Sequence, residues 1–267
     1  MPETVLITGA TSGIGLETAR RLASRDTHVL LHARTAEEGE HALEELVKTG
    51  ADPLRLKVAV ADFIKLSEVR ELADRISREH PRLDVLINNA ATVGPDGRVI
   101  TADGHELTLQ VNYLAPYLLT RLLWGPLTAG PGSRVVNVSS SLHRSGHLHW
   151  GDLDFAARYS RVAAYAQSKL ALTLFTKGLA EYGQGGPVAV AVHPGIVTTP
   201  LMAIYGRVGG PVEEGAAVVA HLAAPGTGLD NGAYYQGLTP GHAAPIAAER
   251  KAVGRLWTLS ARLTGLA

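Results

Sequence analysis

Tyr165 and Lys169 lie four residues apart in the stretch Ala-Ala-Tyr-Ala-Gln-Ser-Lys. On a helix, this spacing places two side chains on one face. A tyrosine has an ordinary pKa of about 10, and a nearby cation favours its phenolate. Lys169 could supply that cation, so the pair could exchange a proton with a substrate near neutral pH. The alternative is a solvated surface pair, and the rest of the chain must decide between them.

A glycine-rich turn near the start of the chain indicates a dinucleotide site. The β-branched and apolar run Glu3 to Thr8 predicts a strand, and helical periodicity begins at Leu16. Glycines allow positive φ and close approach of a diphosphate, and a helix N-terminus favours an anion. The expected cofactor-binding residues in the turn are Gly9, Thr11, Ser12, Gly13, Ile14 and Gly15. Their spacing departs from G-x-G-x-x-G, and a tight connection without a ligand is the alternative.

Strands and helices alternate along the following sequence. The strands are nearly continuous apolar runs, which are typical of a parallel sheet covered on both faces. We therefore predict one α/β domain over residues 1–267, a doubly wound Rossmann-type parallel sheet with helices on both faces. The expected strands are 27–32, 54–60, 83–88, 133–139 and 188–193, and the expected helices are 36–49, 67–80, 102–124 and 162–182.

Polar residues follow the predicted strands, where ligands bind in open α/β sheets. They are Thr8-Gly9, Ala33-Arg34, Asp62, Asn88-Asn89, Ser139-Ser140 and His193-Pro194-Gly195. Because the carboxyl ends of parallel strands meet at one edge of the sheet, we expect these residues to surround one site.

The ordered motifs resemble those of the short-chain dehydrogenase/reductase family, in its single-domain branch. They are Thr8-Gly9-x-x-x-Gly13-x-Gly15, Asn88-Asn89-Ala90, Asn112, Ser140, Tyr165-x-x-x-Lys169 and Pro194-Gly195. Within the family, the chain is similar to the retinol dehydrogenase-like subgroup. The segments that carry this similarity are 158–161, 191–195, 232–235 and 255–266. Folds and subfamilies host many chemistries, so the resemblance says less about the substrate.

The resemblance implies a role for each catalytic residue. Tyr165 would be the general acid or base for a carbonyl or alcohol oxygen, and Ser140 would hydrogen-bond that oxygen. Lys169 would hold the nicotinamide ribose and lower the tyrosine pKa, and Asn112 would hold a water for proton relay. Three consecutive serines leave the serine ambiguous; the second serine of Asn-Val-Ser-Ser, Ser140, matches the family position. The loop 143–159 would form a wall of the substrate site.

Cofactor preference follows from the end of the second predicted strand. An NAD site of this kind places an acidic residue about 20 positions beyond the glycines. Here Arg34 occupies that place, and a guanidinium could hold a 2′-phosphate through a bidentate pair. We therefore predict NADP(H). The alternative is an exposed arginine before a helix that Thr35 and Glu38 start as a capping box.

The resemblance assigns further residues to the cofactor. Asp62 would meet the adenine amino group, while Asn89 and Ala90 would line the adenosine ribose. Along the nicotinamide and phosphates would lie Pro194, Gly195, Val197 and Thr199. The segment at about 200–212 would cover the substrate.

Composition excludes several other functions. Lys and Arg total 25, as do Asp and Glu, so the net charge of zero argues against nucleic acid as a partner. The chain has no cysteine, and no carboxylate stands at a recognised ligand spacing from His143, His147 and His149, so we expect no metal and place these histidines at the site entrance. No apolar run approaches 18 residues. A soluble, cytoplasmic protein without a membrane partner is expected.

The sequence thus predicts an NADP(H)-dependent oxidoreductase that interconverts a small-molecule carbonyl and an alcohol, with a biosynthetic intermediate as a candidate substrate. Two alternatives use the same site: a dinucleotide sensor without turnover, and a catalyst of a non-redox step. The resemblance also implies that helices 102–124 and 162–182 could form a homo-oligomer interface. Substrate, direction and oligomeric state do not follow from the sequence.

Overall fold

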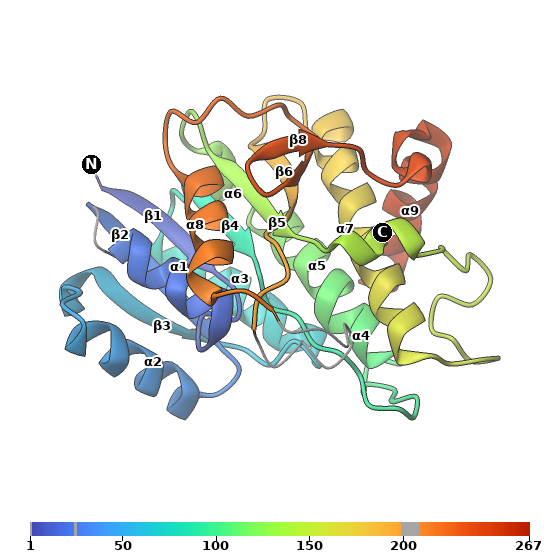
Figure 1. Ribbon diagram of the computed structural model, residues 1–267, viewed down its shortest axis with the longest axis horizontal. Helices are drawn as coiled ribbons and strands as arrows, with labels where there is room; N and C mark the ends of the chain where they lie inside the picture. Colours follow the sequence, from blue (N-terminus) through green and yellow to red (C-terminus); the bar gives the residue numbers. More distant parts are fainter. Residues whose placement is uncertain (1, 24–25, 199–208) are drawn as a thin grey trace.

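A computed structural model describes residues 2–23, 26–198 and 209–267 of the chain. Within these residues, eight strands form one sheet in the order β3-β2-β1-β4-β5-β6-β7-β8. All neighbouring pairs are parallel except the last, β7 with β8, which is antiparallel (Figure 1). The strands are β1 Glu3–Ile7, β2 Thr27–Ala33, β3 Leu56–Val60, β4 Val85–Asn88, β5 Arg134–Val138, β6 Val188–His193, β7 Tyr234–Gln236 and β8 Thr239–Gly241. The predicted doubly wound fold is confirmed.

Each central strand is apolar on both faces because helices cover both faces of the sheet. Alternate residues of β1 illustrate this, since Leu6 packs in one core and Val5 and Ile7 pack in the other. The core around Val5 includes residues of α1 Gly13–Ala23, α2 Ala36–Lys48 and α8 Val212–Ala223. The core around Leu6 includes α3 Leu66–Glu79, α5 Ala115–Leu122, α7 Arg161–Tyr182 and α9 Arg250–Leu263.

The strand order reverses direction between β1 and β4, which opens a crevice at their carboxyl ends. On one side of this point the chain continues to β2 and β3, and on the other to β5 and β6. The turns after these strands therefore approach one another. This reversal brings residues that are far apart in the sequence to one site.

Helix α7 carries both Tyr165 and Lys169, and its position decides between their two interpretations. Fifteen of its 22 residues are buried. Tyr165 is 4% exposed and Lys169 is 2% exposed, so the pair does not lie on a solvated helix surface. The Ser160 side chain caps the helix by accepting from the Ala163 N–H.

The prediction of one continuous helix over 102–124 is wrong, because the helical segment starts later and is interrupted. The helical segment begins with α4 Leu107–Leu109, because the Glu106 carboxylate caps it by accepting from the N–H groups of Thr108 and Leu109. A bridge from Ile100 to Glu106 occupies the preceding residues. A π-helical turn, Gln110–Leu114, then separates α4 from α5, and α6 Trp124–Thr128 follows α5.

The third predicted strand also begins later than expected. Pro53–Arg55 forms one 3₁₀ turn, which Asp52 caps by accepting from the Leu54 N–H, so β3 starts at Leu56. The helix predicted from Leu16 begins three residues earlier, at Gly13. The other predicted elements agree with the structure within one or two residues at each end.

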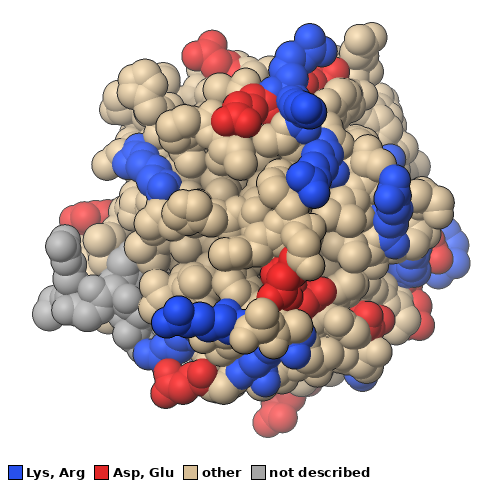
Figure 2. All heavy atoms as spheres, turned by 90° about the vertical axis from the view of Figure 1, so that its right-hand side faces the viewer, with Lys and Arg blue, Asp and Glu red and all other residues tan. Residues whose placement is uncertain are grey.

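The C-terminal quarter contains elements that the sequence analysis did not assign: α8, β7, β8 and α9. Helix α8 packs beside α1, and α9 packs on α7 (Figure 1). No helix among the described residues is long and apolar enough to span a bilayer. Figure 2 shows one face of the molecule, where acidic and basic side chains both occur among uncharged ones, as the balanced composition leads one to expect.

Candidate active site

A cavity of about 550 Å³ lies at the carboxyl ends of the strands, and this volume is in the range of small-molecule sites. The turns after β1, β2, β3, β4, β5 and β6 all contribute to its lining, together with α7. The predicted residues that line it are Gly9, Thr11, Ser12, Gly13, Ile14, Gly15, Arg34, Asp62, Asn89, Ala90, Tyr165, Lys169, Pro194, Gly195 and Val197. The fold therefore brings most of the predicted site together.

The glycine turn after β1 needs its glycines for conformation and for space. Gly9 and Gly13 have φ of +63° and +54°. A Cβ on Gly15 would lie 2.1 Å from the Gly9 carbonyl oxygen and 2.5 Å from Asn89 Nδ2. The turn is thus packed so closely on the start of α1 that only hydrogen fits at position 15.

Asn89 holds this turn from the neighbouring strand end. Its Nδ2 donates to the carbonyl oxygens of Thr8 at 2.8 Å and Gly9 at 3.1 Å. The Thr8 hydroxyl accepts from the N–H groups of Asn89 and Ala90, each at 2.9 Å. Asn89 lines the cavity, as predicted, but its side-chain amide is used to join β4 to the glycine turn.

His32 is a cavity residue that the sequence analysis missed. Its Nδ1 accepts from the Gly9 N–H at 3.0 Å, so its Nε2 carries the proton and donates to the Ala61 carbonyl oxygen at 3.0 Å. The ring also packs on Phe63, with 4.2 Å between ring centroids. Burial lowers the pKa of His32 to about 4, so the neutral ring joins the turns after β1 and β3. In the sequence, the signal that could have identified His32 was a histidine within an otherwise apolar strand.

Arg34 lies at the edge of the cavity, directly after β2. Its side chain is 65% exposed, and Nη2 forms an ion pair of 2.5 Å with Oε1 of Glu38, one turn into α2. Thr35 caps the helix by accepting from the Glu38 N–H. The structure therefore contains the predicted cap, and it also places Arg34 and Glu38 together in the cavity lining.

Asp62 follows β3 on the same side of the cavity. Its Oδ1 accepts from the Ile64 N–H at 3.2 Å, and its own N–H donates to Glu68 Oε2 at 2.7 Å. These bonds fix the turn that carries the carboxylate. Asp62 is thus both a turn residue and a cavity residue.

Lys169 is a buried charged residue that lines the cavity. Its Nζ donates to the Val138 carbonyl oxygen at 2.8 Å and lies 5.7 Å from the centroid of the Tyr165 ring. Burial lowers the pKa of Lys169 to about 7, from an ordinary value of 10.5. Both the ammonium and the amine are therefore populated near neutral pH.

The serines after β5 have different partners. The Ser139 hydroxyl bonds with the Lys169 carbonyl oxygen at 3.2 Å and the Thr173 hydroxyl at 2.9 Å, so it is directed at α7. The Ser140 hydroxyl accepts from the Leu142 N–H at 3.1 Å and caps a 3₁₀ turn, 141–145. Ser139 contributes to the cavity lining and Ser140 does not, although Ser140 is the residue that the sequence favours.

Asn112 lies inside the π-helical turn and is buried, so it is not a solvent-facing helix residue. Its Oδ1 accepts from the Thr92 N–H at 2.7 Å, while Nδ2 donates to the Thr92 carbonyl oxygen at 2.9 Å and to Ser168 Oγ at 3.0 Å. Asn112 does not itself line the cavity, but its partner Thr92 does. π-helical turns often occur at functional sites.

The turn after β6 closes the remaining side of the cavity. Gly195 has φ of +104°, and Val197 forms a bridge with Gly210. Thr199 and residues 200–208 of the predicted substrate-covering segment lie outside the described residues. Their predicted roles are therefore not addressed by the geometry.

The loop 143–159, which was predicted to form a wall of the substrate site, is only partly exposed. No residue of 143–159 is among those that line the cavity. Part of this loop is bonded to α7, where Gln167 accepts from the His149 N–H and donates to the Leu153 carbonyl oxygen. His143 is fully buried rather than at the entrance. In the part of the chain that the structure describes, no group of three His, Cys, Asp or Glu residues could hold a metal ion.

Comparisons with known proteins agree with this geometry. The model of the family described as short chain dehydrogenase matches residues 3–206. Retinol dehydrogenase 13 of Mus musculus is 38% identical, over 99% of this chain and 84% of the relative.

Two solved structures are also similar. A crystal structure of an uncharacterised protein from Mycobacterium paratuberculosis has a TM-score of 0.81 and 33% identity, over 99% of this chain and 96% of the other. A metagenomic short-chain oxidoreductase in complex with NADP has a TM-score of 0.68 and 25% identity, over 88% of this chain and 96% of the other.

Proposed function

Because the chain belongs to the short chain dehydrogenase family, we propose that it is an NADP(H)-dependent oxidoreductase that interconverts a carbonyl group and an alcohol. The observation that carries the proposal is the burial of Tyr165 and Lys169 beside a cavity that also contains the glycine turn after β1. The name of the relative retinol dehydrogenase 13 refers to an alcohol substrate, which supports the reaction class.

The residues present fit a bound dinucleotide. Gly9 and Gly13 adopt positive φ in a turn that leads directly into α1, and a helix N-terminus favours a diphosphate. Bound NADP(H) would supply or accept a hydride at its nicotinamide. The turn after β6, with Gly195 and Val197, would hold the nicotinamide side, and Asp62 would face the adenine.

Tyr165 is the proposed general acid in the direction of carbonyl reduction. Its hydroxyl would donate a proton to the substrate oxygen, and it would accept that proton in the reverse direction. Ser140 would hydrogen-bond the same oxygen and stabilise the charge that develops there. The bonds of the Ser139 hydroxyl to α7 support the choice of Ser140.

Lys169 would bind the nicotinamide ribose and favour the tyrosine phenolate. The negative charge of a bound nucleotide favours the ammonium form of a buried lysine, which otherwise has a lowered pKa. Asn112, held by Thr92 and Ser168, would organise a water for proton relay. The proposed roles of Lys169 and Asn112 require both side chains to remain buried where they are.

Arg34 is the proposed selector of NADP(H) over NAD(H). A guanidinium can hold a 2′-phosphate through charge-assisted hydrogen bonds. The NADP complex of the similar metagenomic oxidoreductase supports this cofactor for the fold. Since one sheet joins β1 near the N-terminus to β7 and β8 near the C-terminus, we also propose that residues 1–267 form a single domain.

The function is tested by following NADPH absorbance with a library of aldehydes and ketones, and by identifying the products. We expect alcohol formation coupled to NADPH oxidation. Tyr165→Phe should lower turnover by about 10²–10⁴-fold, while NADPH affinity, measured by calorimetry, stays unchanged. Retained turnover in this variant would overturn the proposed acid. Binding of NADPH without turnover would favour a sensor, and a product formed without NADPH oxidation would favour a non-redox step.

A further inference from the structure

His143 is a buried side chain that the proposed reaction does not use. Its Nδ1 lies 2.6 Å from the Ser140 carbonyl oxygen, and its Nε2 lies 3.1 Å from the Ala244 N–H. A carbonyl oxygen only accepts and a backbone N–H only donates, so the ring must carry its proton on Nδ1 and accept at Nε2. The neutral ring thereby joins the backbone of Ser140 to a residue 104 positions later in the chain.

The segment that contains Ala244 is fixed to the turn after Ser140 by further contacts. The Tyr234 ring packs on His143, with 4.5 Å between ring centroids. Arg144 lies over the same tyrosine at 5.3 Å and donates to the His242 carbonyl oxygen at 3.0 Å and to Gln236 Oε1 at 3.1 Å. Residues 234–244 therefore act as a support for this turn.

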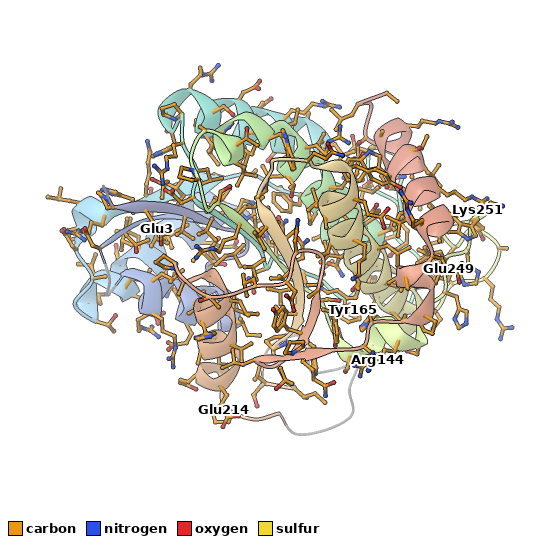
Figure 3. All side chains as sticks on the ribbon, turned by 90° about the horizontal axis from the view of Figure 1, so that it is seen from above. Glu3, Arg144, Tyr165, Glu214, Glu249 and Lys251 are labelled. Carbon is orange, nitrogen blue, oxygen red and sulfur yellow. The ribbon has the colours of Figure 1, made fainter. Side chains whose placement is uncertain are left out.

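The supported turn also packs on α7, the helix that carries Tyr165. Figure 3 labels Arg144 on the turn and Tyr165 on α7, at the same end of the molecule. The Ser140 carbonyl oxygen also accepts from the His143 backbone N–H at 3.1 Å. The ring and the backbone N–H of His143 thus both bind the Ser140 carbonyl oxygen, in a turn that packs on the buried helix α7.

We propose that His143 is a positioning residue for Ser140, and that through Ala244 the C-terminal segment sets the geometry of the substrate-oxygen site. This inference rests on the proposed role of Ser140. A shift of the serine backbone by 1 Å would move the hydroxyl out of its hydrogen-bond range, and such displacements cost up to about 100-fold in rate.

The neutral form of His143 is favoured by its surroundings. Burial lowers its pKa, the Ser140 carbonyl oxygen opposes this shift, and the positive charge of Arg144 lowers the pKa further. Tyr234 on β7 packs on the ring, and His193 on β6, whose own pKa burial lowers to about 4, interacts with it electrostatically. An imidazolium would direct an N–H at the Ala244 N–H, so protonation would break the link.

Two substitutions at His143 separate positioning from general stability. His143→Phe fills the space but lacks both ring nitrogens, whereas in His143→Asn the side-chain amide can still donate to the Ser140 carbonyl oxygen. His147→Phe, an exposed histidine of the same loop, is the matched control. For each variant, kcat, KM for the carbonyl substrate, NADPH affinity and thermal midpoint are measured.

We expect His143→Phe to lower kcat by about 10–100-fold with NADPH affinity unchanged, and His143→Asn to recover most of that loss. Hydrogen exchange at the Ala244 N–H should accelerate in His143→Phe. An unchanged kcat, or parallel losses of kcat, NADPH affinity and thermal midpoint without rescue by asparagine, would overturn the inference. Absence of turnover in the wild type would instead overturn the proposed function. The hydrogen bond from Ala244 to His143 can be tested without turnover, because it predicts slow hydrogen exchange at the Ala244 N–H and, by nitrogen NMR, a proton on Nδ1 of His143.

Discussion

The proposed nucleotide side of the cavity is built from backbone turns, whereas the proposed catalytic side is built from buried side chains. On the nucleotide side, the turns after β1 and β3 are held by His32 and Asn89, and the main requirement is space. On the catalytic side, Lys169 and Asn112 are enclosed by α7 and the π-helical turn, and the main requirement is that each polar group keeps a partner.

The two sides should therefore respond differently to substitution. An added methyl group is damaging where backbones touch, because neither backbone can move without displacing a strand. A removed polar group is damaging where it leaves a buried partner without a hydrogen bond, or where chemistry depends on its charge. Buried charge is also costly in itself, so a catalytic residue can lower the stability of the fold that holds it.

Gly15→Ala is expected to have the largest effect, on the nucleotide side. The new Cβ would meet the Gly9 carbonyl oxygen at 2.1 Å, so the turn must open and its phosphate site is lost. We expect NADPH binding to become undetectable by calorimetry. Gly125→Ala is the control, because a Cβ there meets no atom within 4 Å. Wild-type affinity in Gly15→Ala would show that backbone clearance does not define this side.

Lys169→Met is expected to lower turnover by about 10²-fold or more and NADPH affinity by about 10–100-fold, as for the loss of charge-assisted bonds. Lys177→Met, on the same helix, should change neither turnover nor NADPH affinity.

The buried lysine also affects the stability of the fold. Because the folded-state pKa of Lys169 is about 7 and its ordinary pKa is 10.5, the unfolded chain binds more protons between these values, and the stability contributed by this group rises with pH there.

The cofactor-free Lys169→Met protein should lack this rise. It should be more stable than the wild type at pH 7 and below, where the wild type bears the full cost of burying the ammonium, and the difference should shrink toward pH 10. Urea unfolding of both proteins at pH 6.5 and 9.5 measures this. Equal pH dependence in the two proteins would contradict a buried lysine with a lowered pKa.

The Arg34–Glu38 ion pair offers the smallest and most selective test. Arg34→Ala should weaken NADPH binding by about 10–100-fold, since it removes charge-assisted bonds, and leave NADH binding unchanged. Glu38→Gln should strengthen NADPH binding by about fivefold, because it removes a competing carboxylate worth about 1 kcal/mol at an exposed site. Lys48→Ala and Glu44→Gln, which alter a similar pair farther along α2, serve as controls. NADH preference in the wild type would refute the assignment to Arg34.

Local pattern was enough to predict residues of the turns after β1 to β4 that line the cavity, because each of these strands is followed by a turn whose residues are adjacent in the sequence. The start of α4 was missed because Glu106, not an earlier residue, provides the cap. Elements α8, β7, β8 and α9 were not assigned, and β7 and β8 have only three residues each, too few to show a periodicity.

The residues that line the cavity were easier to predict than the partners that hold them in place. Tyr165 and Lys169 were found by spacing, but one partner of Asn112, Ser168, and one partner of His143, Ala244, lie 56 and 101 residues away. Such pairings arise only when the sheet and helices pack, and no local signal distinguishes a buried histidine from one at a pocket entrance. The sequence shows directly that Arg34 stands where an NAD site would have an acidic residue. Its ion pair with Glu38 could be predicted only if the start of the helix were known.

The place of β7 in the sheet bears on how the protein is made. A chain that leaves the ribosome from its N-terminus can pair β1 to β6 before Tyr234 has been synthesised. Until then β6 has one unpaired edge, which is the kind of surface that joins other chains. Nascent chains halted before β7 should therefore depend most on chaperones, and synthesis of β7 would cover this edge of β6.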